Sequence, residues 1–370
     1  MGALLWARGA GQGVAAAGGQ AVASESPPEV LSFISERSGN RDVYLISISK
    51  DGQRERALSR SAADESNLAP TPDGSHLLLA VAQGSAERGD RRFHFALAPL
   101  NTEPDSPRGS PDAPPPALFP PRAVLLNPSF APDGKSLYFE SESTGLRDLF
   151  RLFLTASHRA AGAPQQLTRN PEGNFAPSVC ARGDLLAFTS SRDRVSELYR
   201  MRRDGSDLRR LTYSAGSEWQ PRCHPSGERI YFVSDRDGAD RIYSVHVNGS
   251  EPRRLTRREL DAALVEDAPT ISPDGRRLAF ILRGAGVGAR LHVVELATGA
   301  ELEVRTPAAL SASEPAWSLG HDGRPLRLAV TLGGERGAAT PQVYVTDPQY
   351  QGAQQLTHAP GPNWHPLWVR

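Results

Sequence analysis

The most regular hydrophobic pattern in the chain runs from Trp219 to Thr256. Short apolar and β-branched runs, such as 229–234 and 241–245, alternate there with two-residue turn signals. Runs of this length suit strands rather than helices. Asn248-Gly249 is a hairpin signal because both positions tolerate a positive φ. The stretch therefore predicts four antiparallel strands in about 40 residues.

The same order of runs and turns recurs on both sides of this stretch. Clear copies occupy residues 128–168, 177–212 and 269–306, and weaker copies begin near residues 68 and 315. A lone four-stranded sheet leaves its apolar faces uncovered, so it needs neighbours of the same kind. A repeat of about 40 to 50 residues with four strands predicts a β-propeller.

The two ends of the chain complete this pattern. Residues 31–59 read as a repeat without its first strand, and residues 364–370 read as a first strand alone. We predict that the C-terminal strand joins the N-terminal blade, which closes the ring and removes its exposed edges. Seven second-strand centres are present: Phe33, Leu79, Phe139, Phe188, Phe232, Phe280 and Val330. The predicted fold is therefore an all-β propeller of four-stranded antiparallel blades with seven blades. Six blades are the alternative, with the block near residue 68 outside the ring.

Several recurring motifs resemble those of a known family. Ser272-Pro-Asp-Gly275, Ala187-Phe-Thr-Ser190 and Arg253-Arg-Leu-Thr256 are similar to the repeats of TolB-type propellers. Propellers of tricorn and of prolyl-oligopeptidase-like proteases share this repeat type. The resemblance covers about residues 30 to 370 and implies one propeller domain. Its TolB branch implies a bacterial cell envelope protein in the periplasm or another extracytoplasmic compartment, with the cytoplasm as the alternative. Such a resemblance does not fix function.

Two segments depart from the repeat pattern. Residues 1–29 are rich in Ala and Gly, and they are predicted to be a disordered leader or the remnant of a signal peptide. Residues 101–122 contain eight prolines. Proline cannot donate a ladder hydrogen bond, so this segment is predicted to be an extended or disordered surface loop inserted into the domain at 30–370.

Charge and cysteine content restrict the function classes. The formal net charge is zero, which gives no electrostatic footprint for nucleic acid. No apolar run approaches the roughly 18 residues of a membrane-spanning helix. Cys180 and Cys223 fall on the first strands of adjacent repeats. Strand alternation places their side chains on opposite faces, so no disulfide is predicted.

Catalytic and metal-binding motifs are absent from the sequence. It contains neither a Gly-x-Ser-x-Gly elbow nor a His-Glu-x-x-His motif. Oligogalacturonate lyases resemble this repeat type and hold a metal with channel histidines. His224 and His365 lie on predicted innermost strands, but on blades that are not adjacent. We predict no metal and no cofactor, and a channel-metal polysaccharide lyase is the alternative function.

The residues just before the anchoring proline of each repeat differ from one repeat to the next. Structural positions in a repeat should be alike, so variation indicates where function can reside. These residues are expected at the funnel mouth of the channel. The candidate binding residues are Glu218, Trp219, Gln220, Glu266, Asp267, Glu314, Trp364 and His365.

Aromatic side chains within a polar rim suit a protein or peptide partner. The sequence hypothesis is a non-enzymatic, monomeric propeller scaffold that binds such a partner. Trp219 is predicted to lie on the rim because its neighbours Glu218 and Gln220 are polar. Strand alternation opposes this, because it places Trp219 on the same face as Cys223, and Trp364 on the same face as Trp368.

Overall fold

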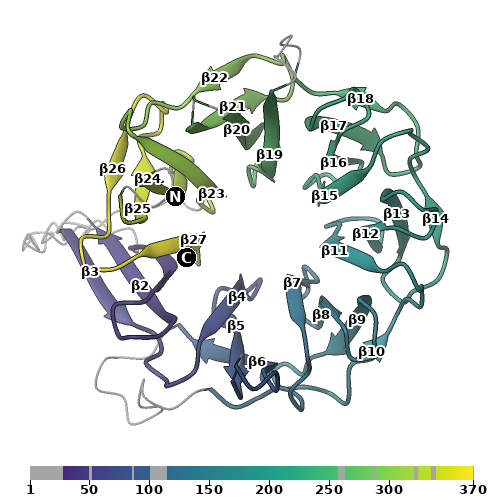
Figure 1. Ribbon diagram of the computed structural model, residues 1–370, viewed down its shortest axis with the longest axis horizontal. Coiled ribbons are helices and arrows are strands. Elements are labelled where there is room, and N and C mark those ends of the chain that lie inside the picture. The colour runs from purple at the N-terminus through teal and green to yellow at the C-terminus, as the bar shows by residue number, and fades with distance from the viewer. Residues whose placement is uncertain are drawn as a thin grey trace, which may run out of the picture.

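The computed structural model describes residues 28–49, 52–85, 87–100, 115–256, 263–284, 286, 288–320, 324–334 and 339–369. Within these ranges the regular elements are 27 strands, with no helix. The strands form seven antiparallel sheets arranged as blades around a central channel (Figure 1). The seven-bladed propeller predicted from the sequence is confirmed. The predicted leader lies outside the described residues up to residue 27, as does the predicted insert from 101 to 114.

Blades 1 to 4 are named in ring order, and the innermost strand of each is given first. Blade 1 contains β27 (Asn363–Trp368), β1 (Glu29–Ser35), β2 (Asp42–Ser49) and β3 (Gly52–Ala57). Blade 2 contains β4 (Glu65–Pro70), β5 (His76–Gln83) and β6 (Arg92–Pro99). Blade 3 contains β7 (Leu125–Phe130), β8 (Ser136–Ser141), β9 (Asp148–Phe153) and β10 (Gln165–Gln166). Blade 4 contains β11 (Asn174–Val179), β12 (Leu185–Ser190), β13 (Glu197–Arg202) and β14 (Arg209–Arg210).

Blades 5 to 7 follow the same order of strands. Blade 5 contains β15 (Glu218–Cys223), β16 (Arg229–Ser234), β17 (Arg241–His246) and β18 (Arg253–Arg254). Blade 6 contains β19 (Leu264–Ile271), β20 (Arg277–Gly284), β21 (Gly288–Glu295) and β22 (Glu301–Glu303). Blade 7 contains β23 (Leu310–Trp317), β24 (Leu328–Gly334), β25 (Gln342–Thr346) and β26 (Ala353–Gln355).

The C-terminal strand closes the ring as predicted. β27 pairs antiparallel with β1, with Leu31 opposite Trp368 and Ser35 opposite Asn363, and the two ends of the colour scale meet in this blade (Figure 1). Trp368 is fully buried, and its indole Nε1 donates a hydrogen bond of 3.2 Å to the carbonyl oxygen of Ala316 in blade 7. The last strand therefore completes one blade and also contacts the next.

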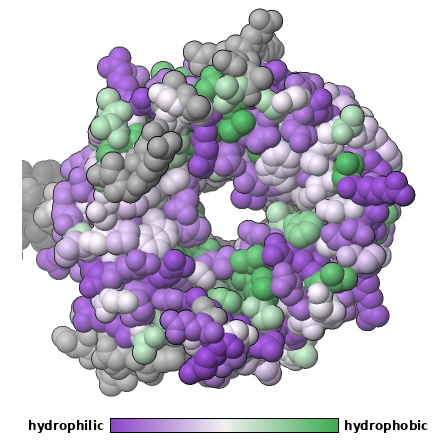
Figure 2. All heavy atoms as spheres, viewed as in Figure 1, coloured by the Kyte–Doolittle hydropathy of each residue, from purple (hydrophilic) through white to green (hydrophobic). Residues whose placement is uncertain are grey.

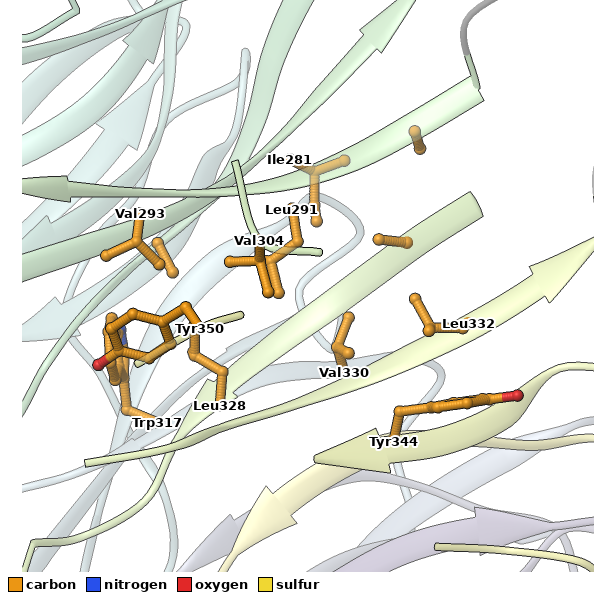
Figure 3. Close-up of a cluster of buried hydrophobic side chains, with 13 residues drawn as sticks. Ile281, Leu291, Val293, Val304, Trp317, Leu328, Val330, Leu332, Tyr344 and Tyr350 are labelled. Carbon is orange, nitrogen blue, oxygen red and sulfur yellow. The ribbon is translucent and has the colours of Figure 1, made fainter. Parts of the chain in front are cut away.

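The hydrophobic core lies between blades. In Figure 3, Ile281 and Leu291 from blade 6 face Leu328 and Val330 from blade 7. Each blade thereby covers the apolar face of its neighbour. This explains why the sequence shows apolar runs on second and third strands rather than a strict apolar-polar alternation.

The end of the proline-rich segment packs against blade 2. The backbone N–H of Arg122 donates to the carbonyl of Phe93, and the reverse bond is also made, each at 2.7 Å. Phe119 is 5% exposed, and its ring stacks on Phe139 with centroids 5.6 Å apart. The prediction of an unpaired surface loop is therefore wrong for residues 117–122, which take the place of a fourth strand beside β6.

Each innermost strand contains a β-bulge at the same point. In every blade the pairing with the second strand shifts there. One residue of each bulge has a φ between 48° and 56°, and these residues are Asn67, Asn127, Ala176, Gln220, Ala268, Glu314 and His365. A bulge resets the alternation of side chains, so residues on its two sides no longer follow the period of two.

Cys180 and Cys223 form a disulfide between blades 4 and 5, with Cα atoms 5.0 Å apart. The prediction of two unlinked cysteines is wrong. Cys180 lies one residue beyond β11, where the chain turns towards β12, so strand alternation does not govern its side chain. Cys223 ends β15, and its N–H donates a 3.0 Å hydrogen bond to the Ser178 hydroxyl of blade 4. Neighbouring strands thus hold the two cysteines together.

Candidate functional site

The channel mouth is formed where the innermost strands begin. Three residues of each strand, here called the rim triplet, end with the left-handed residue of the bulge. The rim triplets are residues 65–67, 125–127, 174–176, 218–220, 266–268, 312–314 and 363–365. All eight candidate residues belong to these triplets, and the three positions of a triplet have different environments.

The first position of the triplet is structural. Glu218 and Glu266 are both 0% exposed. The Glu266 carboxylate accepts hydrogen bonds from the N–H of Ile242 at 2.8 Å and from the hydroxyl of Thr256 at 2.9 Å, both in blade 5. Glu218 accepts a 2.8 Å charged hydrogen bond from Arg236. The prediction that Glu218 and Glu266 face a partner is not supported by this geometry, because both carboxylates are used in joints between blades.

Two of these joints bring acidic groups together. The Thr212 hydroxyl lies 2.6 Å from Glu197 Oε2 and 2.9 Å from Glu218 Oε2. Burial raises the pKa of Glu197 to about 7, with the Glu218 carboxylate adding to the effect. At the joint between blades 1 and 2, burial likewise raises the pKa of Glu65 to about 7, and Asp42 adds to the shift. The carboxyl groups of Glu197 and Glu65 therefore keep their protons up to about neutral pH.

The third position links successive blades around the channel. Gln220 accepts a 3.0 Å hydrogen bond from the N–H of Ala268 and donates one of 3.0 Å to Asp267. Glu314 accepts a 2.8 Å bond from the N–H of His365, whose Nδ1 lies 3.1 Å from its other carboxylate oxygen. The side chain of one blade thus satisfies an edge N–H of the next, which the bulge leaves unpaired.

Electrostatic pairing accompanies two of these links. Burial opposes ionisation of Glu314, but the hydrogen bonds and charge of His365 outweigh it and lower the pKa of that carboxyl. Asp267 forms an ion pair of 3.2 Å with Arg283 in the same blade. Gln220, Asp267, Glu314 and His365 are all partly exposed. They belong to the channel wall as well as to the joints.

The second position carries the residues that differ most in chemistry. They are Ser66, Leu126, Phe175, Trp219, Asp267, Ser313 and Trp364. Trp219 is partly exposed. Trp364 is partly exposed too, but it packs against the core between blades 1 and 2, with the Arg41 guanidinium 5.7 Å from its ring. The two predicted aromatic residues are therefore not equivalent.

Apolar side chains gather on one arc of the rim. Leu126, Phe175 and Trp219 occupy the second position in three successive blades, 3 to 5. Figure 2 shows apolar surface beside the channel opening over β7 and β11. Leu146, between β8 and β9, is 46% exposed, and Tyr213, in the loop that leads into β15, is 78% exposed. Sequence reasoning did not select these two because they lie in turns outside the repeat motifs.

The histidines considered as metal ligands have protein partners. His224 Nδ1 lies 2.8 Å from the Ser226 hydroxyl, and His224 Nε2 lies 2.8 Å from the carbonyl oxygen of Gly275. A Cβ at Gly275 would lie 2.7 Å from the His224 ring, so glycine is needed for this contact between blades. Within the described ranges, no three His, Cys, Asp or Glu side chains are placed to hold a metal ion.

The fold and the variable channel mouth define a seven-bladed propeller scaffold. Residues 154–283 match the model of the TolB beta propeller domain. Residues 154–283 therefore carry TolB-type propeller repeats, as the motifs predicted. An uncharacterized protein of Agrobacterium fabrum, Atu1656, is 33% identical over 107 residues, which is 27% of this chain and 34% of that protein.

Solved structures share the fold at low sequence identity. TolB from Acinetobacter baumannii is 18% identical with a TM-score of 0.54, over 92% of this chain and 66% of TolB. A puromycin-hydrolyzing peptidase of Mycobacterium tuberculosis is 18% identical with a TM-score of 0.61, over 91% of this chain and 54% of the peptidase. Oligogalacturonate lyase from Vibrio parahaemolyticus is 13% identical with a TM-score of 0.57, over 90% and 85%. The chain thus spans only part of TolB and of the peptidase, and these likenesses show the fold alone.

In the part of the chain that the structure describes, no helix has the length and apolar character needed to cross a membrane.

Proposed function

We propose that this protein is a non-enzymatic scaffold whose channel mouth binds a protein or peptide partner. The supporting observation is the second position of the rim triplets. Leu126, Phe175 and Trp219 form an apolar arc there, while the corresponding residues elsewhere on the rim include Ser66 and Asp267. Aromatic and apolar groups beside polar ones are typical of residues that dominate binding energy.

The joints between blades give this surface a fixed shape. Gln220 and Glu314 accept hydrogen bonds from the left-handed rim residues Ala268 and His365 of the next blades. The disulfide at Cys223 holds blades 4 and 5 together. A partner therefore meets a rim whose backbone is already in place. Such preorganisation lowers the entropy lost on binding.

The disulfide also supports an extracytoplasmic location. Disulfides persist in oxidising compartments such as the bacterial periplasm and are rare in the cytosol. This agrees with the envelope location that the TolB resemblance implies. Fractionation of the native host, with antibody detection of the chain, tests the location. Recovery in the cytoplasmic fraction with reduced cysteines would contradict it.

Partner binding is tested by comparing variants in one capture experiment. Wild type, Trp219→Ala and Leu302→Ala are immobilised and exposed to the envelope fraction of the native host. Leu302 is 40% exposed on the outer strand of blade 6 and serves as an apolar control away from the rim. We expect a protein retained by wild type and by Leu302→Ala but lost from Trp219→Ala. Equal retention by all three would contradict the rim as the binding surface.

Metal content distinguishes the proposed scaffold from the alternative, a channel-metal lyase. His224 would have to abandon two hydrogen bonds to become a ligand, which does not favour that alternative. Elemental analysis of the purified protein checks this, and a stoichiometric transition metal would favour the lyase over the scaffold.

A further inference from the structure

One side chain on the innermost strands departs from its counterparts. Arg222 follows the anchoring proline of β15 and lies opposite Tyr231 of β16. Its counterparts, by the same register in the other blades, are Ala69, Ser129, Ser178, Thr270, Ala316 and Leu367.

 Of this set, Ala316 and Ala69 are the smallest, and none of the six carries a charge. Because equivalent positions in a repeat should be alike, a single long cation here indicates a role that belongs to blade 5 alone.

Arg222 lies on β15, the innermost strand of blade 5. The innermost strands line the central opening, which passes through the molecule (Figure 2). The side chain of Arg222 is exposed to solvent. Loss of hydration nevertheless lowers the pKa of its guanidinium, and burial is the single cause of the shift. An exposed group that is still partly desolvated is surrounded by protein on its sides, as a channel-lining group is.

The charge of Arg222 has no counter-ion among the described residues. Its Nη1 donates a 3.1 Å hydrogen bond to the carbonyl of Pro221, in the same strand. No described carboxylate lies within ion-pair distance of it, whereas Arg210, Arg229 and Arg236 each pair with one. The remaining N–H donors of the guanidinium are thus left for a ligand. A partly desolvated and unpaired cation is costly to keep, so a compensating anion is favoured.

The backbone beside Arg222 is fixed on both sides. Pro221 precedes it, and Cys223, which follows it, is joined to Cys180 by the disulfide. The N–H of Cys223 also donates to the hydroxyl of Ser178 at 3.0 Å. The base of the arginine side chain is therefore held in place, which reduces the entropy lost when its guanidinium engages a ligand.

We propose that Arg222 anchors an oxyanion-binding site inside the channel. The ligand is a carboxylate or phosphate group, held by the planar fork of the guanidinium through two parallel N–H···O bonds. The inference deepens the proposed function, because it names the chemical group that a partner segment entering the channel would present. It rests on Arg222 and its surroundings, not on the apolar rim.

The test uses small oxyanions and the full chain with its disulfide intact. Protein labelled with ¹⁵N-arginine is titrated with sodium acetate and, separately, with inorganic phosphate, with sodium chloride at matched ionic strength as the reference. The Arg222 Nε–Hε signal is identified by its loss in Arg222→Gln. In a uniformly labelled sample, the amide signals of Ser178 and Cys223 report binding in variants that lack this guanidinium.

We expect a saturable change in the chemical shift of the Arg222 Nε–Hε signal with acetate, with phosphate or with both. The anion that binds with the higher affinity identifies the group that the site prefers. Arg222→Gln should lose the response, and Arg222→Lys, which keeps the charge but not the fork, should bind at least about tenfold more weakly. Arg182→Gln removes an exposed arginine on the surface of blade 4 and should leave binding unchanged.

A response that chloride reproduces, or that persists in Arg222→Gln, would overturn the proposal. Thermal unfolding of each variant shows whether it is folded. Because the assay needs no partner, a negative result would leave the rim proposal standing, and failure of the rim would leave this site untouched.

Discussion

Trp364 and Trp368 lie on the same short strand, yet they pack against opposite neighbours of blade 1. Trp364 packs against the core shared with blade 2, and Trp368 lies in the core shared with blade 7. On a regular strand, residues four apart face the same side. The bulge at His365, with a φ of 56°, reverses this relationship. The sequence-based expectation that the two tryptophans share a face is therefore wrong.

This difference predicts unequal costs for removing the two indoles. Trp368 is fully buried, so the Trp368→Ala protein should lose about 3 to 5 kcal/mol of unfolding free energy. Trp364→Ala should cost less, because Trp364 is already partly exposed. Chemical denaturation of both variants checks the order. Equal losses would contradict the assignment of Trp368 to the closing joint.

Trp219→Ala should separate binding from stability. Trp219 is a partly exposed rim residue, so its replacement should lower the free energy of unfolding only slightly. The same replacement should weaken the binding free energy of the partner by at least about 2 kcal/mol. Melting temperature and affinity are measured on the same preparation, with Leu302→Ala as the control. A large fall in melting temperature would mean that Trp219 belongs to the core and that its assignment to the site is wrong.

Glu65→Gln should change how stability depends on pH. Burial raises the pKa of Glu65 to about 7 from an ordinary value of 4.5, so the folded chain binds this proton more tightly than the unfolded chain. The tighter proton binding at Glu65 therefore contributes fully to the stability of the fold below about pH 4.5, and this contribution is lost as the pH rises towards 7. Glutamine cannot ionise and avoids this loss.

The expected result concerns the difference between the variant and the wild type. From pH 5 to pH 8, the unfolding free energy of Glu65→Gln should gain about 2 to 3 kcal/mol relative to wild type. Urea denaturation at both pH values measures the change. Glu87→Gln, which alters an exposed carboxylate, should show no such gain. A constant difference for Glu65→Gln would show that Glu65 is ionised throughout this pH range.

Removing the disulfide should weaken the whole ring. Cys180 and Cys223 are 43 residues apart, and a cross-link over a loop of that size typically stabilises by about 2 to 4 kcal/mol. The double substitution of both cysteines by serine should lose this amount in denaturation experiments. Reductant should destabilise wild type and leave the double variant unchanged. Free thiols in the oxidised, native protein, detected by mass spectrometry after alkylation, would contradict the link.

The proline-rich segment should divide into two parts with different behaviour. Replacing residues 101–114 with a Gly-Ser linker should preserve the melting temperature, since loop length costs little once its ends are held. Phe119→Ala should cost about 3 to 5 kcal/mol, because the Phe119 ring is buried against Phe139. Thermal unfolding of both proteins measures this contrast. If the linker variant were the less stable, the division at residue 115 would be wrong.

Local patterns were enough to predict the ring. Turn pairs such as Asn248-Gly249 and apolar runs such as Arg229–Ser234 act over a few residues, so their meaning does not depend on the rest of the fold. The closing strand was also predictable, because the first strand of one repeat and the last three of another were visible at opposite ends. Ser190-Ser-Arg192 and Ser234-Asp-Arg236 recur at the ends of second strands, and Arg192 and Arg236 donate to Ser190 and Ser234.

The site was harder to predict because it depends on contacts between blades. Glu218 looks like an exposed acid in a variable stretch, but its environment is supplied by Thr212 and Arg236, which no local pattern reveals. The positive φ of Gln220 is uncommon for a residue other than glycine, so the bulge gave no signal of its own. One signal was available and not used: Phe119 is a lone aromatic residue among prolines, which favours packing over disorder.

Completion of blade 1 by β27 has a consequence for the order of events during synthesis. The ribosome produces β1 long before β27, and at roughly 5 to 20 residues per second the interval lasts tens of seconds. By the end of that time, blades 2 to 7 have all their strands, while the inner edge of β1 still has no partner. The cell must therefore keep this edge from other strands until the nascent chain supplies Trp368 opposite Leu31.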